Sequence, residues 1–414
     1  MTAPANDRIP PAALAMWALA ASTFLYAFLQ RVSPSVMVED LMAGFGVGGT
    51  LLGNLSAFYL YAYAALQIPL GMLFDRFGVR RLMAGSMLAA AAGSAIFAAA
   101  QAIEVAYLGR MLIGAGVACT FVGALTVTAQ SMPPARFAMM AGLVQMLGML
   151  GAIFGQAPLA ALVAALGWRG TLLAMGALAA AIGVALHLVL RDRPAGARPQ
   201  ARLSDGLRAV ARVRETWACA IFGFAMTGPM LAFGGLWAVP YFATAYELPR
   251  TTAAALTSLI FAGWGVGAPL VGWISDRLGR RREPMLACAA IAGLALAAVV
   301  FGPRWPLWAL VPILLVHGAC ASAMVLAFAM AREQNDPGAN SVAMAVVNTF
   351  VVGSGALLQP LIGWLLDRGW TGQVAGGARV YPPEAFAAAL AVLPPLFVLA
   401  LLAGLAMRER PRAR

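Results

Sequence analysis

The sequence predicts an all-α protein that crosses a membrane many times. Of its 414 residues, 62% are hydrophobic and only 11% are charged, and the mean hydropathy is +0.83. A water-soluble domain needs more polar surface than this composition supplies. Apolar runs of roughly 20 residues, each long enough to cross a hydrocarbon core of ~30 Å as a helix, follow one another along the chain. We therefore expect a polytopic helical membrane protein whose surface largely faces the lipid bilayer.

Charged residues, prolines and glycines divide the chain into twelve predicted transmembrane helices. The first six lie near residues 13–37, 50–73, 82–102, 106–130, 137–164 and 170–190. The second six lie near residues 216–242, 252–274, 284–303, 306–331, 340–365 and 385–407. The predicted domains are an N-terminal six-helix bundle (1–190), a cytoplasmic linker (191–215) and a C-terminal six-helix bundle (216–414). Within the linker, residues 203–213 have the pattern of an amphipathic helix that lies on a membrane surface.

The arginines predict the orientation of the chain. All 28 basic residues are arginines, and with the N-terminus inside, 21 of them fall in cytoplasmic segments and five in outer loops. Because basic residues favour the cytoplasmic side, we expect both termini in the cytoplasm and the protein in the inner (plasma) membrane. These loops account for the net charge of +12, so the sequence predicts no nucleic-acid partner.

The cysteines and the N-terminal segment predict neither a cofactor nor a cleaved leader. Cys119, Cys219, Cys288 and Cys320 lie in apolar segments without paired spacing, which indicates reduced packing residues and neither a disulfide framework nor a metal site. The first residues have a faint likeness to a signal peptide. Their apolar run continues through Phe28, however, so we expect this stretch to remain as the first span.

Two sets of residues repeat along the chain and predict that its halves are related. Gly71, Asp75, Arg76 and Gly78 recur 201 residues later as Gly272, Asp276, Arg277 and Gly279. A second set recurs after 202 residues: Gly151, Pro158, Leu159, Gly167, Trp168 and Gly170 match Gly353, Pro360, Leu361, Gly369, Trp370 and Gly372. The repeat predicts two bundles with pseudo-two-fold symmetry, an arrangement typical of proteins that work by alternating access.

The first repeated motif ends the second and eighth spans on their cytoplasmic side. We expect Gly71 and Gly272 to permit close approach of neighbouring helices. Asp75 and Asp276 can pair with an arginine or cap a nearby helix, where the macrodipole favours an anion. The arginines of the motif, which include Arg76, Arg80 and Arg277, face the cytoplasm. The motif is therefore a candidate gate, made in one arrangement of the bundles and broken in the other, or else it only fixes topology.

These motifs resemble those of a known family. The pattern Gly-x-x-x-Asp-Arg-x-Gly-x-Arg-Arg, at 71–81, resembles the signature loop of the major facilitator superfamily (MFS). Arg110, Gly114, Gly116 and Ala118 resemble its Arg-x-x-x-Gly-x-Gly-x-Ala motif in the fourth span. The resemblance covers the whole chain and implies the MFS fold, with two six-helix bundles that rock about a central site. It also implies a coupling or structural role for Arg110.

The charges within the predicted spans point to an anionic or zwitterionic substrate. All sixteen acidic residues fall in loops or at span ends, whereas Arg31 and Arg110 lie inside spans. A cavity with arginine and without carboxylates attracts anions. Arg31 resembles the first-span arginine of the organic-anion branch of the superfamily, where it contacts substrate, although the seventh span here lacks the second basic residue of that branch. Two roles stay open for Arg31: substrate ligand or structural residue.

Polar and aromatic side chains within the spans supply the other candidates for substrate binding. They are Tyr26, Gln30, Tyr59, Tyr63, Gln145, Trp237, Trp264, His317 and Asn348. Tyr59 and Tyr63 are spaced to share one helix face with Ser56 and Gln67. His317 could carry protons near neutral pH, or it could be a hydrogen-bonded packing residue.

We expect a secondary active transporter, monomeric, that moves a small organic anion or zwitterion such as a carboxylate, an amino acid or a peptide. Proton symport or exchange would drive it. The alternative is drug or siderophore efflux, which methionine-rich stretches favour. The missing carboxylate and the missing glycines of the fifth span (GAIFGQAPLA) count against it. The spans hold neither a nucleophile–base set nor a nucleotide-binding motif, so we expect no enzyme.

Overall fold

The computed structural model describes residues 10–67, 69–133, 136–191, 208–336 and 339–409. Almost all of this chain is helical. Ten helical segments in the described part are long and apolar enough to cross a membrane, or up to eleven if the bent pair α2 (Val38–Phe45) and α3 (Gly49–Gln67) is one span. These helices confirm the prediction of a helical protein with many spans.

The N-terminal half begins with α1 (Pro11–Val32) and a short 3₁₀ turn, η1 (Ser33–Val36), before α2 and α3. Five helices follow: α4 (Leu70–Ala99), α5 (Ile103–Val117), α6 (Thr120–Ser131), α7 (Phe137–Phe154) and α8 (Ala157–Val189). Two glycines interrupt long helices, because Gly78 in α4 has φ 75° and Gly167 in α8 has φ 70°. Only glycine adopts this backbone conformation readily, so the chain bends at both positions.

The C-terminal half begins with α10 (Arg214–Pro229), a π-helical segment η3 (Met230–Trp237) and α11 (Ala238–Ala245). It continues through α12 (Arg250–Leu278), α13 (Arg282–Phe301), α14 (Leu307–Ala321), α15 (Met324–Gln334) and α16 (Asn340–Arg368). A small antiparallel hairpin, β1 (Val374–Ala375) and β2 (Ala378–Arg379), precedes α17 (Pro383–Leu390) and α18 (Pro394–Ala406). Of the predicted amphipathic helix at 203–213, residues 203–207 lie outside the described part, and residues 208–211 are helical.

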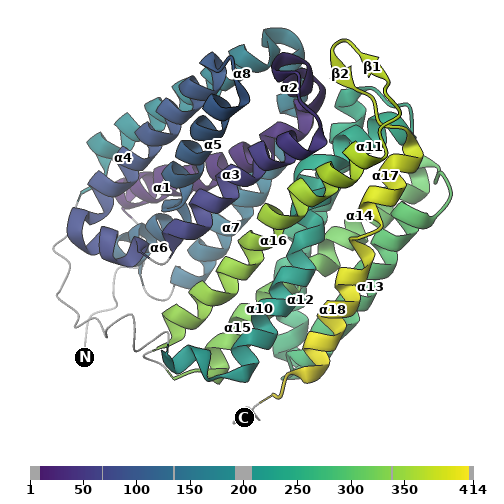
Figure 1. Ribbon diagram of the computed structural model, residues 1–414. Coiled ribbons are helices and arrows are strands. Elements are labelled where there is room, and N and C mark those ends of the chain that lie inside the picture. Colours follow the sequence, from purple (N-terminus) through teal and green to yellow (C-terminus); the bar gives the residue numbers. More distant parts are fainter. Residues whose placement is uncertain (1–9, 68, 134–135, 192–207, 337–338, 410–414) are drawn as a thin grey trace, which may run out of the picture.

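The two halves lie side by side and meet along α3 and α16, and along α7 and α12 (Figure 1). Glycines bring the backbones of α3 and α16 into contact. A Cβ atom on Gly49 would lie 2.7 Å from the carbonyl oxygen of Gly363, and one on Gly53 would lie 2.5 Å from that of Gln359. At one end of the molecule, hereafter the α2 end, lie α2, the hairpin and α17, whereas α15 lies toward the other end (Figure 1).

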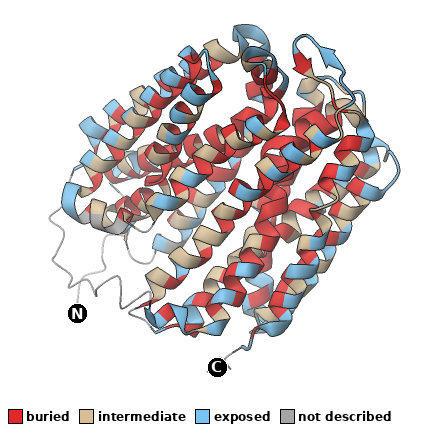
Figure 2. Cartoon of the chain, viewed as in Figure 1, coloured by how far each residue is buried: buried red, intermediate tan, exposed pale blue. Residues whose placement is uncertain are grey.

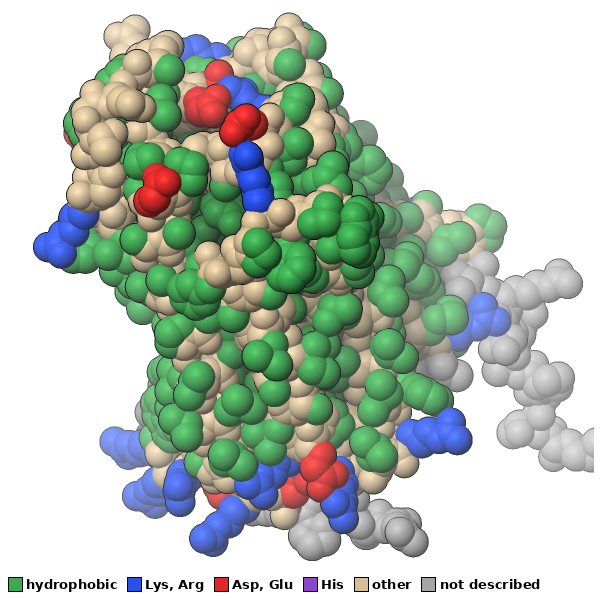
Figure 3. All heavy atoms as spheres, turned by 90° about the vertical axis from the view of Figure 1, so that its right-hand side faces the viewer, with side chains coloured by type: hydrophobic (Ala, Val, Ile, Leu, Met, Phe, Trp, Pro, Cys, Tyr) green, Lys and Arg blue, Asp and Glu red, His purple; other side chains and the backbone are tan. Residues whose placement is uncertain are grey.

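The buried residues lie where helices face one another, and they form a continuous core that extends through both halves (Figure 2). Hydrophobic side chains cover the middle of the face in Figure 3, whereas charged side chains gather toward its two ends. Large apolar residues are exposed in the described chain, among them Trp308 at 79% and Leu294 at 72%. An apolar band this extensive is the surface expected of a protein that faces lipid.

Candidate functional site

Arg31, in the last turn of α1, lies buried against three aromatic rings. Its guanidinium carbon is 4.3 Å from the ring centroid of Phe28, 4.9 Å from that of Tyr63 and 5.7 Å from that of Tyr59. The side chain interacts electrostatically with both tyrosine hydroxyls, and its Nε atom has no hydrogen-bond partner. No described residue forms an ion pair with it, so aromatic faces take the place of a carboxylate.

Arg110 lies close by on α5 and is completely buried. Its Nη1 donates a hydrogen bond of 2.9 Å to the carbonyl oxygen of Gln30, while Nε and Nη2 have no partner. Its guanidinium carbon is 5.0 Å from the ring centroid of Tyr59. The ring of Tyr59 therefore contacts both intramembrane arginines, and these residues with Phe28 and Tyr63 are called the arginine cluster below.

Close packing of glycine fixes the position of Tyr59 relative to Arg110. A Cβ atom on Gly114 would lie 2.2 Å from the carbonyl oxygen of Tyr59, so α3 and α5 touch at this point. Two residues further along the same motif, a Cβ atom on Gly116 would lie 2.5 Å from the carbonyl oxygen of Ser86. The hydroxyl of Tyr59 donates a bond of 2.8 Å to the carbonyl oxygen of Ala27, which ties α3 to α1.

The side chains of Tyr26 and Gln30 hold α1 against α4 beside Arg110, which bonds to the carbonyl oxygen of Gln30 and interacts electrostatically with the hydroxyl of Tyr26. The Nε2 atom of Gln30 donates to the hydroxyl of Tyr26 at 2.6 Å and to that of Ser94 at 3.0 Å. Both predicted residues are completely buried, and only the Oε1 atom of Gln30 has no partner. Their polar groups thus serve mainly contacts between helices.

The remaining predicted binding residues are spread over other helices. Trp237 donates 3.0 Å to the carbonyl oxygen of Gln359, Trp264 is buried with an unpartnered Nε1, and Gln145 is half-buried on α7. Asn348 on α16 donates 3.3 Å to the side chain of Gln67 on α3, one turn from Tyr63. Asn348, which belongs to the C-terminal half, therefore contacts α3, the helix that carries Tyr59 and Tyr63.

His317 lies within the C-terminal half and away from the arginine cluster. Its Nδ1 lies 3.0 Å from the carbonyl oxygen of Ala292 on α13, and its ring is 5.8 Å from that of Phe397 on α18. Its Nε2 atom has no partner in the described chain, so the two roles considered for His317 both stay predictions.

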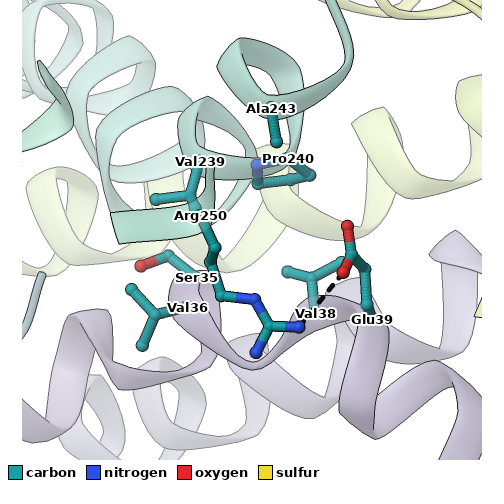
Figure 4. A pocket seen from close by; sticks show the side chains of 8 residues that line it. All are labelled: Ser35, Val36, Val38, Glu39, Val239, Pro240, Ala243 and Arg250. Atoms are coloured by element: carbon teal, nitrogen blue, oxygen red, sulfur yellow. Dashed lines mark hydrogen bonds and ion pairs between the residues drawn. The ribbon is translucent and has the colours of Figure 1, made fainter. Parts of the chain in front are cut away.

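Two cavities lie elsewhere in the described chain. One of about 10 Å³, room for one water at most, is lined by residues that include Ser35, Val36, Glu39 and Arg250 (Figure 4). The other, of about 490 Å³, lies within the N-terminal half between the ends of α1, α4, α6 and α8. Neither of them is lined by Arg31 or Arg110.

Comparisons with known proteins identify the family. The model of the Major Facilitator Superfamily matches residues 19–249 and 218–414, which together cover most of the chain. The chain belongs to the Major Facilitator Superfamily. This match confirms the resemblance found in the sequence, and it makes the protein a multi-pass membrane transporter rather than an enzyme.

Solved MFS structures share the fold at low sequence identity. A bacterial homologue of the human lysosomal transporter Spinster, solved in an inward-facing and unoccupied conformation, has a TM-score of 0.78 at 16% identity, covering 95% of this chain and 97% of that chain. The nucleoside transporter NupG (D323A mutant) has a TM-score of 0.77 at 15% identity, covering 94% and 99%.

Curated MFS relatives match only parts of the chain. The uncharacterized transporter YybO of Bacillus subtilis is 31% identical over 134 residues, which cover 32% of this chain and 31% of YybO. The probable nitrate/nitrite transporter NarK2 of Mycobacterium tuberculosis is 29% identical over 244 residues, which cover 57% of this chain and 60% of NarK2. The alignments thus span less than two thirds of either relative.

The repeated MFS signature loop contains one glycine that the backbone requires and one that it does not. Gly279 has φ 66° and ends α12, and its counterpart Gly78 has φ 75°. A Cβ atom on Gly272, in contrast, would meet nothing within 4 Å. The expected close approach at Gly272 is therefore wrong for this structure, and the second glycine of the motif has the structural role. The side chain of Asp75 lies outside the described part, and for Gly71 only the helical backbone of α4 is described.

In the second copy of the loop, the charges form contacts within the C-terminal half. Asp276 pairs with Arg281 at 3.0 Å, and Arg281 also pairs with Glu333 at 3.1 Å. Arg277 lies over the ring of Trp273 and Arg76 over that of Phe77, both in exposed positions. Arg80 is half-buried. Both of these ion pairs lie within the C-terminal half.

The sequence reasoning missed the charged contacts at the α2 end. Arg250, at the start of α12, pairs with Asp40 at 2.5 Å. It also pairs with Glu39 at 3.1 Å, as Figure 4 shows. Asp367, at the end of α16, accepts hydrogen bonds from the first residues of α3. A usable signal was present, because Val47 and Gly48, just before α3, offer no side chain that could cap that helix.

Proposed function

We propose that this protein is a secondary active transporter that moves a small organic anion or zwitterion by alternating access. The observation that carries the proposal is the arginine cluster, in which two buried guanidinium groups share the ring of Tyr59 and form no ion pair with a described carboxylate. Uncompensated positive charge at membrane depth is costly and favours an anionic ligand. The unpartnered donors of Arg31 and Arg110 are suited to an acid group.

One relative supports an anionic substrate. NarK2 is named as a probable nitrate/nitrite transporter, and its match covers 57% of this chain. An arginine held by aromatic faces, as Arg31 is, also fits the organic-anion branch that its position in the first span resembles. Carboxylates, amino acids and peptides are therefore the substrate classes to test first. Efflux of drugs or siderophores is the alternative, which the methionine-rich stretches and a relative named an MFS efflux transporter, inpD of Emericella nidulans (33% identical over 26% of this chain), favour.

The proposed architecture has twelve spans in two pseudo-symmetric bundles, 1–190 and 216–414, joined by the linker 191–215. The ten long apolar segments, together with α3 and the shorter helix α7, support this count. We place both termini in the cytoplasm of the inner membrane, so that the α2 end faces outside, and this assignment rests on the arginine distribution. One relative, YajR of Escherichia coli, is named an inner membrane transport protein. We expect a monomer.

Coupling to protons or exchange completes the proposal. His317 is buried in the C-terminal half, with Nδ1 on the carbonyl oxygen of Ala292, and this makes it a poor proton carrier. Arg110 is the better candidate for a coupling role, because it links Gln30 on α1 to Tyr59 on α3. Movement of either helix would change its contacts. Dependence of uptake on external pH would separate symport from exchange.

A ligand screen tests the substrate class. The purified protein would be heated with carboxylates, amino acids, dipeptides, nitrate, phosphate and organic cations, and the shift in its unfolding temperature would be measured. We expect an anionic or zwitterionic hit that is lost in Arg31→Ala and kept in the matched control Arg304→Ala, whose side chain lies exposed in an outer loop. Equal binding by Arg31→Ala and wild type would contradict the site, and a hit only among organic cations would contradict the substrate class.

A further inference from the structure

Helix α3 begins at the α2 end without a cap from its own half. The first N–H groups of a helix have no partner within the helix and need an acceptor. The residues that precede α3, Val47 and Gly48, have no polar side chain that could accept from them. The acceptor comes instead from the other half of the molecule.

Asp367 of α16 caps α3 with both of its carboxylate oxygens. Oδ1 accepts from the backbone N–H of Gly49 at 2.9 Å, and Oδ2 accepts from the N–H of Thr50 at 2.8 Å and from its hydroxyl at 2.6 Å. The side chain of Asp367 is only 19% exposed. A negative charge at this position also faces the positive end of the α3 dipole.

The C-terminal half holds the same carboxylate in place. The hydroxyl of Tyr381 donates to Oδ1 at 2.6 Å and Nη1 of Arg379 donates to it at 3.1 Å. All five groups around Asp367 are therefore donors. An ionised carboxylate satisfies every one of them, whereas an amide in its place would turn an NH₂ group toward donors.

Backbone contacts close the space around this carboxylate. A Cβ atom on Gly363 would lie 2.0 Å from the carbonyl oxygen of Gly49, and one on Gly377 of the hairpin would lie 3.3 Å from Ala43 of α2. The pairs of Arg250 with Asp40 and with Glu39, the second drawn in Figure 4, form another link between the halves. Asp367 thus contacts α3 at a place where the two halves pack closely against each other.

We propose that Asp367 is a latch that caps α3 across the halves and holds the outer end of the transporter closed. The proposal rests on the alternating access proposed above. When the halves separate at this end, Asp367 keeps Tyr381 and Arg379, which belong to its own half, and only the bonds to Gly49 and Thr50 are lost. The cap therefore stabilises the closed outer end specifically and leaves the fold of either half unchanged.

Distance measurement between spin labels tests the latch without any substrate. Labels would be attached at Gln101→Cys and Gln373→Cys, exposed positions in the outer loops of the two halves, after replacement of the four native cysteines. We expect one short distance in this background and a second, longer distance in Asp367→Asn. Loss of a charged cap should raise the longer-distance fraction about 5-fold or more. Glu384→Gln, which removes an exposed carboxylate near the same end, is the matched control and should leave the distances unchanged.

Thr50→Val provides a second test that keeps the charge of Asp367. It removes one of the three bonds that Asp367 makes across the halves, so it should raise the longer-distance fraction less than Asp367→Asn does. Folding of each variant is checked by a single symmetric peak in size-exclusion chromatography. Unchanged distances in folded Asp367→Asn, or in Thr50→Val if the first variant does not fold, would overturn the latch. A latch that opens as expected, combined with unaltered ligand binding by Arg31→Ala, would leave this inference standing and remove the anion site.

Discussion

The ring of Tyr59 contacts two buried arginines, with its centroid 5.7 Å from the guanidinium carbon of Arg31 and 5.0 Å from that of Arg110. One aromatic residue on α3 therefore links a residue of α1 to a residue of α5. Because both arginines depend on its electron-rich face, changes at Tyr59 should affect both.

Two substitutions at Tyr59 should distinguish the role of its hydroxyl from the role of its ring. Tyr59→Phe keeps the ring and loses the hydrogen bond to Ala27, which should cost about 1 kcal/mol of stability. Tyr59→Leu also removes the aromatic face from both arginines and should lose ligand binding as well. Thermal unfolding with and without the ligand measures both effects. Equal binding by the two variants would show that the ring has no role at the site.

Arg110→Met should remove transport without loss of stability. Arg110 is fully buried with two unpartnered nitrogens, and removal of a poorly compensated buried charge is often neutral or stabilising. The unfolding temperature should therefore stay the same or rise, while substrate uptake into proteoliposomes is lost. A large fall in the unfolding temperature would instead make Arg110 a structural residue.

Two glycines of the signature loop should respond in opposite ways to alanine. Gly272→Ala places its methyl group in open space within a helix and should stabilise the protein by roughly 0.5–1 kcal/mol. Gly279→Ala puts a Cβ atom on a residue with φ 66° and should destabilise it by about 1 kcal/mol. Unfolding of the two variants side by side checks the difference. A destabilising Gly272→Ala would point to a close contact in another conformation.

Gly363→Ala should weaken the closed outer end. Its Cβ atom would lie 2.0 Å from the carbonyl oxygen of Gly49, a clash that only separation of α3 and α16 relieves, at a typical cost of 1–3 kcal/mol, roughly, for overpacking. In Gly363→Ala, a larger fraction of molecules should show the longer distance between the spin labels at positions 101 and 373. Gly353→Ala, on the same helix with nothing within 4 Å, is the control. Identical distances in the two variants would contradict the close packing.

The latch should be insensitive to pH up to the alkaline range. Burial and the adjacent Asp367 carboxylate raise the pKa of Tyr381 above its ordinary value. The folded protein therefore favours the protonated phenol, and this stabilisation is complete below the ordinary tyrosine pKa of about 10 and is lost only as the pH rises further. Label distances should stay constant from about pH 7 to pH 9, and Tyr381→Phe should remove any opening at higher pH. Opening of the wild type near neutral pH would require another titrating group.

The sequence predicts the scaffold and part of the candidate site. Helical spacing placed Tyr59 and Tyr63 on one face of their helix, and both lie on Arg31 in the structure. The same reasoning could not tell that Gln30 would be used against Ser94, because the partner is 64 residues away and its position depends on how α1 and α4 pack. The sequence also does not say how deep in the membrane a side chain such as His317 lies, or which neighbouring helix it faces.

Contacts between the halves were the least predictable part. Asp367 and Gly49 are 318 residues apart, and nothing local to either residue specifies that they meet. The uncapped start of α3 predicts that some acceptor is needed but does not say which one. The prediction for Gly272 is wrong for a different reason. Its repeat at a fixed offset predicts a position where helices pack closely, but a Cβ atom there would meet nothing within 4 Å.

The π-helical segment η3 of the seventh span couples that span to residues outside it. A widened turn leaves carbonyl oxygens without backbone partners, and here two glutamine side chains serve them: Gln359 of α16 donates to Leu231 at 2.8 Å, and Gln156, just before α8, donates to Gly234 at 3.3 Å. A substitution at either glutamine would leave a bare carbonyl in an apolar interior. The π-helical winding of η3 thus depends partly on Gln156 in the N-terminal half and Gln359 in the C-terminal half, both distant from η3 in the sequence.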